Sequence, residues 1–588
     1  MRRVLGVAVV ASAVTASGLT ALGNTASAAT PDHRARGNPL NSKIVRFAPG
    51  TSKASMESAV KAAGGHVVTD LSRQNRMAVM PTGAGFDAAV AKQAGVATVW
   101  TEKAISIGYP DRAEGGKAGP PGSGPKGRTI ADPWHDLDSF LDQNAPGVLQ
   151  WDDEVIRARA AWNETTGRRT VRVAVLDSGV DGSHRELQAN YDRSRSGNTV
   201  PCQELIAAGV ENAQIDCGLG DADGHGTWVA SRIAGSLNGF ASNGVAPNVT
   251  IMGYQVLSTA LGYGLTSWIV DGMYQACDND ADLINMSLGG YDLLGTDDED
   301  YLMWVDAVNY CRAKGTAIIA SAGNEHVRIN KVDLTIGGRA LRGVGQVSAG
   351  NDGYMSIVPG DTLENNDLRG LLQTPAGVPG VIMVSSTSNA NGDPGRGTLA
   401  HLASTPTIGA REQLAYYSNY GSRIDLGAPG GARKYGVPRY DGGDGDVLYG
   451  GWGELGALTA GGEICTTPSL ASLLTFACFT VEGQAFGWLQ GTSMSAPNAT
   501  GVAALALSAK SSLKGRPDAL LSRLQRTARR GMVNETGPNS ADTGPSKAGV
   551  ACTSGYCHVK FYPRGRGNPI TGSDAYGAGM VNAAEAVD

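Results

Sequence analysis

The sequence predicts an α/β protein: a three-layer domain with a mainly parallel central sheet, preceded by a small α+β domain of βαββαβ order. From about residue 150 onward, short apolar segments alternate with stretches that carry apolar residues at helical spacing. The first segment, VRVAVL at 171–176, is apolar apart from Arg172, as expected of a parallel strand buried on both faces. Alternation of this kind places helices on both faces of a parallel sheet.

The smaller domain is predicted within residues 29–109. KIVRF, HVVTDL, RMAVMP and ATVWTEK are strand-like, and SKASMESAVKAAGG and FDAAVAKQAG are helix-like. Their order along the chain is the split βαβ pattern. Residues 110–149 begin with a Gly/Pro-rich stretch poor in apolar side chains, which predicts a flexible, exposed linker.

The first 28 residues have the features of a secretory signal peptide. Arg2 and Arg3 precede an uncharged apolar stretch, and Ala26-Ser27-Ala28 is a small-x-small cleavage pattern. We therefore expect cleavage near Ala28 and a secreted, extracellular mature protein. No run of about 18 apolar residues follows, so no membrane partner is expected. The net charge of -6 indicates no basic surface, and hence no nucleic-acid partner.

Eight cysteines follow the predicted signal peptide, which is consistent with an exported chain that meets an oxidising environment. Pairing between neighbours is the simplest arrangement: Cys202 with Cys217, Cys277 with Cys311, Cys465 with Cys478, and Cys552 with Cys557. An alternative for the last pair is a metal site that includes His558. No second pair of ligands accompanies these residues, which favours a loop disulfide.

The predicted parallel strands continue at TIMGYQVL from 250, DLINMSL from 282, TAIIAS from 316 and VIMVSS from 381. Functional sites in such sheets form at the carboxyl ends of the strands. Asp177 follows the first strand directly. ASAGNE at 320–325 ends a later strand and presents Asn324.

Two further motifs contain the other side chains that acyl transfer at this edge of the sheet would require, a histidine and a serine. His225 lies in DGHGTWVA at a predicted helix start, and Ser493 lies in GTSMSAP before an alanine-rich helix. A serine hydroxyl needs an imidazole to accept its proton, and a carboxylate to hold that imidazole in the right tautomer. Asn324 could donate to the oxyanion beside the backbone N–H of Ser493. Each motif alone would be read as structural; together they predict a catalytic Asp-His-Ser set.

The other histidines, His184 among them, lie in polar or upstream sequence and are expected at the surface. The chain order Asp, His, Ser differs from the order in chymotrypsin-like enzymes and α/β-hydrolases. A G-x-S-x-G elbow is absent from the sequence, which argues against an esterase of the α/β-hydrolase type.

The sequence resembles the subtilisin-like serine proteases, the subtilase family. The resemblance spans about residue 150 to the end of the chain and rests on motifs in family order: DSGVDG at 177, GHGTWVA at 224, GVAPNVTIMGYQVL at 244, INMSLGG at 284, ASAGNE at 320, NYGSRIDLGAPGG at 419, GTSMSAPNATGVAAL at 491 and YGAGMVNAAEA at 576. It implies a peptidase domain over residues 150–588 and protein or peptide substrates.

By the same resemblance, residues 29–109 are an inhibitory propeptide that folds with the peptidase and is cut away by self-processing, so that residues 110–149 contain the processing region. Ser287, Leu288 and Gly289 are implied to line the primary specificity pocket. No cofactor is required for the chemistry. Calcium is common in that family, but no calcium motif maps onto specific positions, so no metal residue is assigned.

The sequence departs from the family pattern at several positions. Trp228 stands where a second His is common and is expected to pack, and Ser495, which follows Met494, is assigned to the first turn of the helix. Insertions near 326–378 and 432–488 could shape the leaving-group side of the cleft, form a lid, or be passive additions.

The sequence is also compatible with two other functions. A catalytically silent homologue could bind peptides through the cleft, but binding alone would not require the identities of Asp177, His225, Asn324 and Ser493. A secreted esterase or amidase on the same fold would differ only in its substrate.

Overall fold

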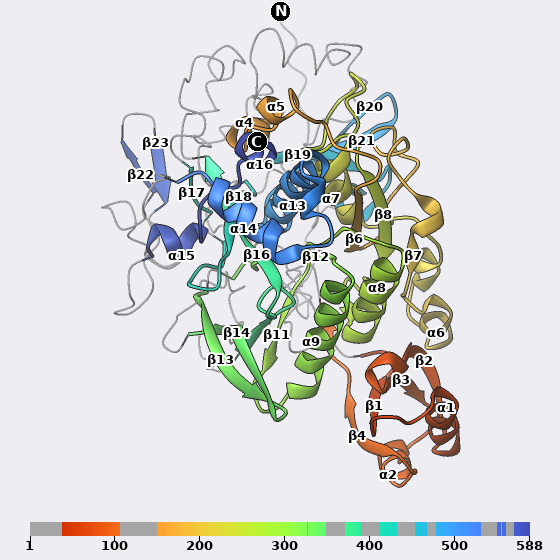
Figure 1. The fold of residues 1–588 in the computed structure, drawn as a ribbon. Helices are drawn as coiled ribbons and strands as arrows, with labels where there is room; N and C mark the ends of the chain where they lie inside the picture. Colours follow the sequence, from red (N-terminus) through yellow and green to blue (C-terminus); the bar gives the residue numbers. More distant parts are fainter. Residues whose placement is uncertain are drawn as a thin grey trace, which may run out of the picture.

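The computed structural model describes residues 38–105, 150–325, 327–348, 371–389, 412–415, 417–431, 453–466, 478–530, 550–553, 556–559 and 570–588 (Figure 1). The predicted signal peptide at 1–28 and the linker at 110–149 lie outside these residues.

A large sheet forms the centre of the molecule, with the strand order β17-β16-β12-β10-β6-β8-β7 and with β18 also paired to β16. Within the described residues, every pairing in it is parallel except that of β16 with β17. The predicted parallel sheet is confirmed. Its strands are β6 (Arg172–Asp177), β7 (Gly197–Asn198), β8 (Thr250–Gln255), β10 (Leu283–Met286), β12 (Ala317–Ser321), β16 (Val381–Asn389), β17 (Glu412–Leu414) and β18 (Leu426–Pro429).

Helices cover both faces of this sheet, because its strands are apolar on both sides. Val173 and Val175 of β6 belong to one core cluster, with α7 (His225–Ala234), α13 (Thr492–Ala509) and α14 (Pro517–Thr527). Ala174 and Leu176 point the other way, into a cluster with α8 (Thr266–Asp278) and α9 (Asp298–Ala313). The three-layer α/β architecture predicted from the sequence is therefore confirmed.

The N-terminal domain has the expected order of elements. It consists of β1 (Lys43–Phe47), α1 (Lys53–Ala62), β2 (Gly65–Leu71), β3 (Arg76–Pro81), α2 (Phe86–Val90) and β4 (Val96–Thr101). The strands form an antiparallel sheet in the order β2-β3-β1-β4, and Ser52 caps α1 by accepting from the N–H of Ser55. One face of the sheet has its own core with the two helices.

The other face of this domain packs on the large domain beside α8 and α9 (Figure 1). Gln74 donates to the phenol oxygen of Tyr274 at 2.6 Å and to the backbone oxygen of Met303 at 2.9 Å. Arg76 pairs with Asp306 at 2.9 Å. Beyond β4, the short strand β5 (Ala104–Ile105) pairs antiparallel with β9 (Gly264–Leu265) of the large domain.

The first insertion adds β13 (Ile329–Ile336), β14 (Arg339–Val347) and β15 (Leu371–Thr374) to β11 (Gly290–Leu293), in the order β11-β15-β14-β13. Because β11 directly follows Gly289, this inserted sheet extends from the predicted substrate-binding segment.

The second insertion forms a sheet of β19 (Glu454–Leu458), β20 (Cys478–Val481) and β21 (Gln484–Leu489) that packs on α7. Trp228 of α7 is fully buried, and its Nε1 donates to Gly487 O at 3.1 Å. Gly456 must be a glycine here, since a Cβ would lie 2.6 Å from the indole of Trp228. The packing role expected of Trp228 is thus observed.

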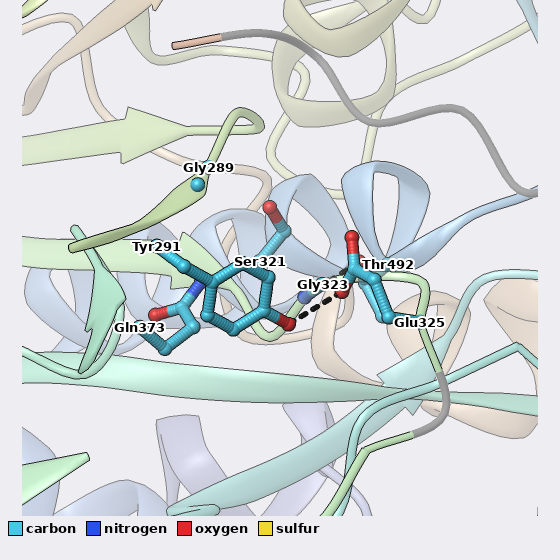
Figure 2. Close-up of a pocket in the computed structure, with 8 residues that line it drawn as sticks. Gly289, Tyr291, Ser321, Gly323, Glu325, Gln373 and Thr492 are labelled. Atoms are coloured by element: carbon cyan, nitrogen blue, oxygen red, sulfur yellow. Dashed lines mark hydrogen bonds between the residues drawn. The ribbon is translucent and has the colours of Figure 1, made fainter. Parts of the chain in front are cut away.

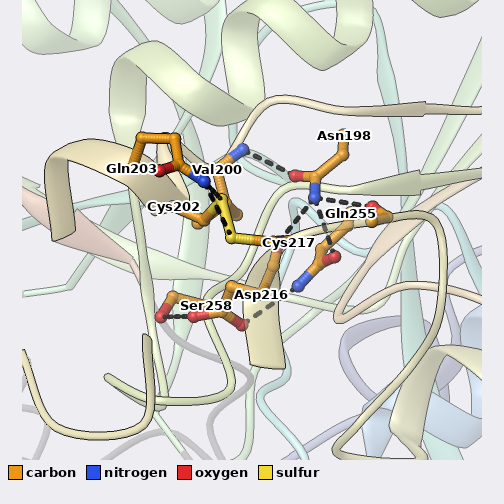
Figure 3. The surroundings of a disulfide bond; sticks show 9 residues. Asn198, Val200, Cys202, Gln203, Asp216, Cys217, Gln255 and Ser258 are labelled. Carbon is orange, nitrogen blue, oxygen red and sulfur yellow. Dashed lines mark hydrogen bonds between the residues drawn. A yellow bond between two sulfur atoms is a disulfide. The ribbon is translucent and has the colours of Figure 1, made fainter. Parts of the chain in front are cut away.

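The described residues contain three disulfides, Cys202–Cys217, Cys277–Cys311 and Cys465–Cys478, with the pairing predicted from the sequence. Figure 3 shows the first, at the start of α6 (Cys202–Ala207), beside Asn198 and Gln255 of the central sheet. The backbones of Cys552 and Cys557 face each other across β22 (Val550–Thr553) and β23 (Tyr556–Val559). Their side chains lie outside what the structure describes, so the fourth pairing stays a prediction.

Candidate active site

Asp177 is the last residue of β6, at the carboxyl edge of the central sheet, and is fully buried. Its Oδ1 accepts a hydrogen bond from the N–H of Ser178 at 2.8 Å and lies 2.8 Å from Nδ1 of His225. The chain can turn sharply after it because Gly179 has a φ of 121°, and a Cβ there would collide with Gly220 O.

His225 is the first residue of α7 and is almost fully buried. Burial lowers the pKa of its imidazole, but the charge and hydrogen bond of Asp177 outweigh this effect, so the net pKa lies above the ordinary value of 6.5. Asp223 accepts from the His225 N–H at 3.0 Å, and burial next to Asp221 raises the pKa of the Asp223 carboxyl to about 7.

Ser493 is the second residue of α13, at the helix end where the backbone N–H groups favour negative charge. Gly491 precedes the helix with a φ of 148°, which favours glycine. The Ser493 hydroxyl donates to Ser287 O at 3.2 Å, and the Ser287 hydroxyl donates to Ser493 O at 2.8 Å. Ser495 lies two residues further along, within the first turn of α13, and is buried against Gly430.

Asn324 follows β12 and is held by the residue that precedes Ser493. Its Oδ1 accepts from both the N–H and the hydroxyl of Thr492, each at 2.9 Å. Because the oxygen is turned toward Thr492, the amide NH₂ is the end that can donate elsewhere. This orienting role of Thr492 was not predicted from the sequence, although the residue belongs to the same GTS motif as Ser493.

A pocket lies next to these residues, lined by Gly289, Gly290, Tyr291, Ser321, Gly323, Glu325, Gln373 and Thr492 (Figure 2). Of the three residues predicted to line the pocket, Gly289 is among the lining residues, and Ser287 and Leu288 are not. Leu288 is buried in the core, and the Ser287 hydroxyl is hydrogen-bonded to Ser493 O. Gln373 comes from the first insertion, so no local sequence signal connected it with the pocket.

A buried ionic network connects α7 and α13, the two helices that carry His225 and Ser493. Arg232 of α7 lies 2.5 Å from Asp152 and 2.7 Å from Asp153 of α4 (Trp151–Val155). Arg232 also donates to Asn498 of α13 at 2.9 Å, and Asn498 donates to Glu454 of the second insertion at 2.7 Å. Burial raises the pKa of the Asp152 carboxyl to about 7, although the charge of Arg232 opposes the rise.

One surface prediction was wrong. His184 is buried, its ring packs edge-on against Phe486, and its Nε2 lies 3.2 Å from Ala485 O. The second insertion covers it, and this long-range contact could not be read from the polar local sequence.

Among the described residues, no group of three or more His, Cys, Asp or Glu side chains could hold a metal ion. The acidic run at 297–300 instead lies at the start of α9, where Lys103 of the N-terminal domain pairs with Asp297. No helix in the described part of the chain is long and apolar enough to cross a membrane.

Comparisons with known proteins agree with this geometry. The model of the subtilase family of peptidases matches residues 168–548. An intracellular serine protease of Paenibacillus polymyxa is 36% identical over 29% of this chain and 47% of its own length. Subtilisin E of Bacillus subtilis is 33% identical over 29% of this chain and 38% of its own length. The chain thus spans less than half the length of these curated relatives.

Among solved structures, the epidermin leader peptide processing serine protease (EpiP) of Staphylococcus aureus superposes with a TM-score of 0.57 at 17% identity. The match covers 93% of this chain and 97% of that one. At this level of identity the likeness supports the fold.

Proposed function

Since the chain belongs to the subtilase family, we propose that it is a serine endopeptidase that uses Asp177, His225 and Ser493 and passes through an acyl-enzyme intermediate. The single observation that carries this proposal is the buried contact of 2.8 Å between Asp177 Oδ1 and His225 Nδ1, at the carboxyl end of the central sheet. A buried carboxylate that holds an imidazole in this way gives the general base of the reaction.

In the proposed mechanism, Asp177 keeps the proton of the neutral imidazole on Nδ1, so that Nε2 is the acceptor. The Ser493 hydroxyl, which now donates to Ser287 O, turns toward Nε2 and gives up its proton as its oxygen attacks the substrate carbonyl. The imidazolium then protonates the leaving amine, and water repeats the sequence to release the acyl group.

The oxyanion formed by this attack needs donors that are already in place. Asn324 is one, because Thr492 anchors its carbonyl oxygen and directs its NH₂ group away from that anchor. The backbone N–H of Ser493, in the first turn of α13, is the other. Because both donors are held in place before the substrate binds, little free energy is spent on reorienting them in the transition state.

We propose that the N-terminal domain is an inhibitory propeptide of a secreted, self-processed precursor. Its support is the docking on α8 and α9 and the pairing of β5 with β9. Extended peptides bind many proteins by adding a strand to a sheet edge, and in this proposal β5 takes the place of such a peptide at β9.

The test compares the wild-type protein with Ser493→Ala, expressed in a host that lacks other extracellular proteases. We expect the wild type to mature, to digest casein and to be labelled at Ser493 by a fluorophosphonate probe. Ser493→Ala should accumulate as the uncleaved precursor. A mature wild-type protein that is neither labelled nor active would instead support a silent homologue, and activity on small esters alone would support an esterase.

A further inference from the structure

The second insertion contacts the backbone that leads into His225. Its short helix α11 (Glu463–Thr466) lies against this segment: the N–H of its first residue donates to Ala222 O at 3.0 Å, and that of its second residue donates to Asp223 O at 3.2 Å. Gly462, just before α11, comes so close that a Cβ on it would lie 2.7 Å from Asp223 O. The insertion therefore supports the chain directly before the histidine.

The same insertion contacts α7 beyond His225, where β19 packs along the helix (Figure 1). Thr459, which follows β19, has its Oγ1 3.1 Å from Thr227 Oγ1. The N–H of Ala457 donates to Ser231 Oγ at 2.9 Å. His225 is thus flanked on both sides by residues that the insertion holds.

Thr227 links these contacts to the end of β6, which carries Asp177. Its hydroxyl donates to Asp221 Oδ2 at 2.5 Å, and Asp221 Oδ1 accepts from the Ser178 hydroxyl at 3.0 Å. Asp221 is buried, so these bonds are not exchanged for bonds to water. A shift of the start of α7 would therefore change the contact of 2.8 Å between Asp177 and His225.

The disulfide Cys465–Cys478 joins α11 to the sheet of the insertion. Cys465 belongs to α11, and Cys478 begins β20, where it lies opposite Gly487 of β21. Gly487 is also the residue whose carbonyl oxygen accepts from the indole of Trp228 in α7. The bridge thus connects the part of the insertion that contacts the chain before His225 with the part that contacts α7 after it.

We propose that the second insertion positions His225 against Asp177, and that the Cys465–Cys478 disulfide holds the insertion in the shape that does so. This inference rests on the proposed function and adds positioning residues to it, which act on the reaction through α7. Without the bridge, α11 loses its covalent tie to β20, and the contacts on the two sides of His225 are no longer held together. A misplacement of about 1 Å can lower a catalytic rate by about 100-fold.

The test replaces Cys465 and Cys478 by Ser, and the matched control replaces Cys277 and Cys311 by Ser. The control bridge joins α8 to α9, on the face of the central sheet opposite to α7. It closes a loop of 34 residues rather than 13, so its loss should lower stability at least as much. Where both variants are folded, we expect the first to lose roughly 10-fold in kcat with little change in KM, and the control to keep both. Titration of active sites with the fluorophosphonate probe corrects kcat for incomplete maturation.

The acid limb of the kcat/KM profile separates positioning from a general loss of stability. Burial lowers the pKa of His225, and the carboxylates of Asp177, Asp223 and Asp221 raise it, with a net pKa above 6.5. When the histidine is held less firmly in these surroundings, its pKa should return toward 6.5. The acid limb of the variant without the insertion's disulfide should therefore lie at lower pH than that of the wild type, and the limb of the control should not move.

Thr459 allows a second test that leaves every disulfide intact. Thr459→Val removes the hydroxyl that contacts Thr227 and should lower kcat by roughly 2- to 10-fold, the worth of one hydrogen bond, whereas Thr459→Ser retains a hydroxyl and should keep kcat. Equal kcat and equal acid limbs in the two folded disulfide variants, or equal kcat for Thr459→Val and Thr459→Ser, would overturn the inference alone. A wild-type protein with neither hydrolysis nor fluorophosphonate labelling would overturn the proposed function, and this inference with it.

Discussion

Replacing Arg232 by Met removes a cation from the buried network while keeping a long side chain. In the folded protein the guanidinium lies between Asp152, Asp153 and Asn498, and all four side chains are buried. Breaking a buried ion pair by removing one partner costs about 3–5 kcal/mol, because the other charge remains in the interior. We expect Arg232→Met to lose stability in this range at pH 8.

The loss should depend on pH. Burial raises the pKa of the Asp152 carboxyl from 3.8 in the unfolded chain to about 7 in the folded protein, so the stability that its protonated form contributes is fully present below pH 3.8 and is lost as the pH rises through about 7. The charge of Arg232 limits this loss by lowering the pKa of Asp152. Without Arg232 the pKa rises further, so the variant goes on losing stability above pH 7.

The assay is urea denaturation at pH 5 and pH 8 in the Ser493→Ala background, which prevents autolysis during the measurement. The control is Arg195→Met, which removes a surface partner of Asp192 and should cost at most about 1 kcal/mol at either pH. A loss for Arg232→Met below 1 kcal/mol at pH 8, or an equal loss at both pH values, would refute the reasoning.

Three further predictions follow from the site and the disulfides. Asn324→Ala should lower kcat on a peptide substrate by roughly 10²- to 10³-fold with little change in KM, because the donor acts in the transition state; a change in KM alone would contradict its role. The acid limb of the kcat/KM profile should lie above pH 6.5, since the neutral imidazole is the base and the pKa of His225 is raised; a limb below 6 would count against the Asp177 contact. Replacing Cys277 and Cys311 by Ser opens a loop of 34 residues and should cost about 3–4 kcal/mol in thermal denaturation; an unchanged Tm would argue that the bridge is not formed in solution.

Much of the fold was predictable because its signals are local. β6 is apolar from Val173 to Leu176, and β12 is apolar from Ala317 to Ala320. Each strand leads to a polar residue of the candidate site, Asp177 after β6 and Asn324 after β12. The start of α7 at His225 and of α13 beside Ser493 follows from glycine positions in the same motifs. Each disulfide observed in the described residues joins two cysteines that are consecutive in the chain, which is the pairing that the nearest-neighbour prediction gives.

Other features depend on contacts between segments that are far apart in the chain. Gln373 reaches the pocket only because β15 pairs with β11. Glu454 meets Asn498, and His184 is buried, because the second insertion folds over α7 and its surroundings.

The sequence by itself determined the alternation of buried strands and helices, and the residue types that can carry acyl transfer. Only the tertiary structure decided which charged side chains are removed from water and which end of the Asn324 amide faces Thr492. It also decided that Glu325 lines a pocket with Tyr291 and Gln373. The physical reason is that strand and helix patterns reflect burial along one segment, whereas the electrostatics of a site depend on every segment that excludes solvent from it.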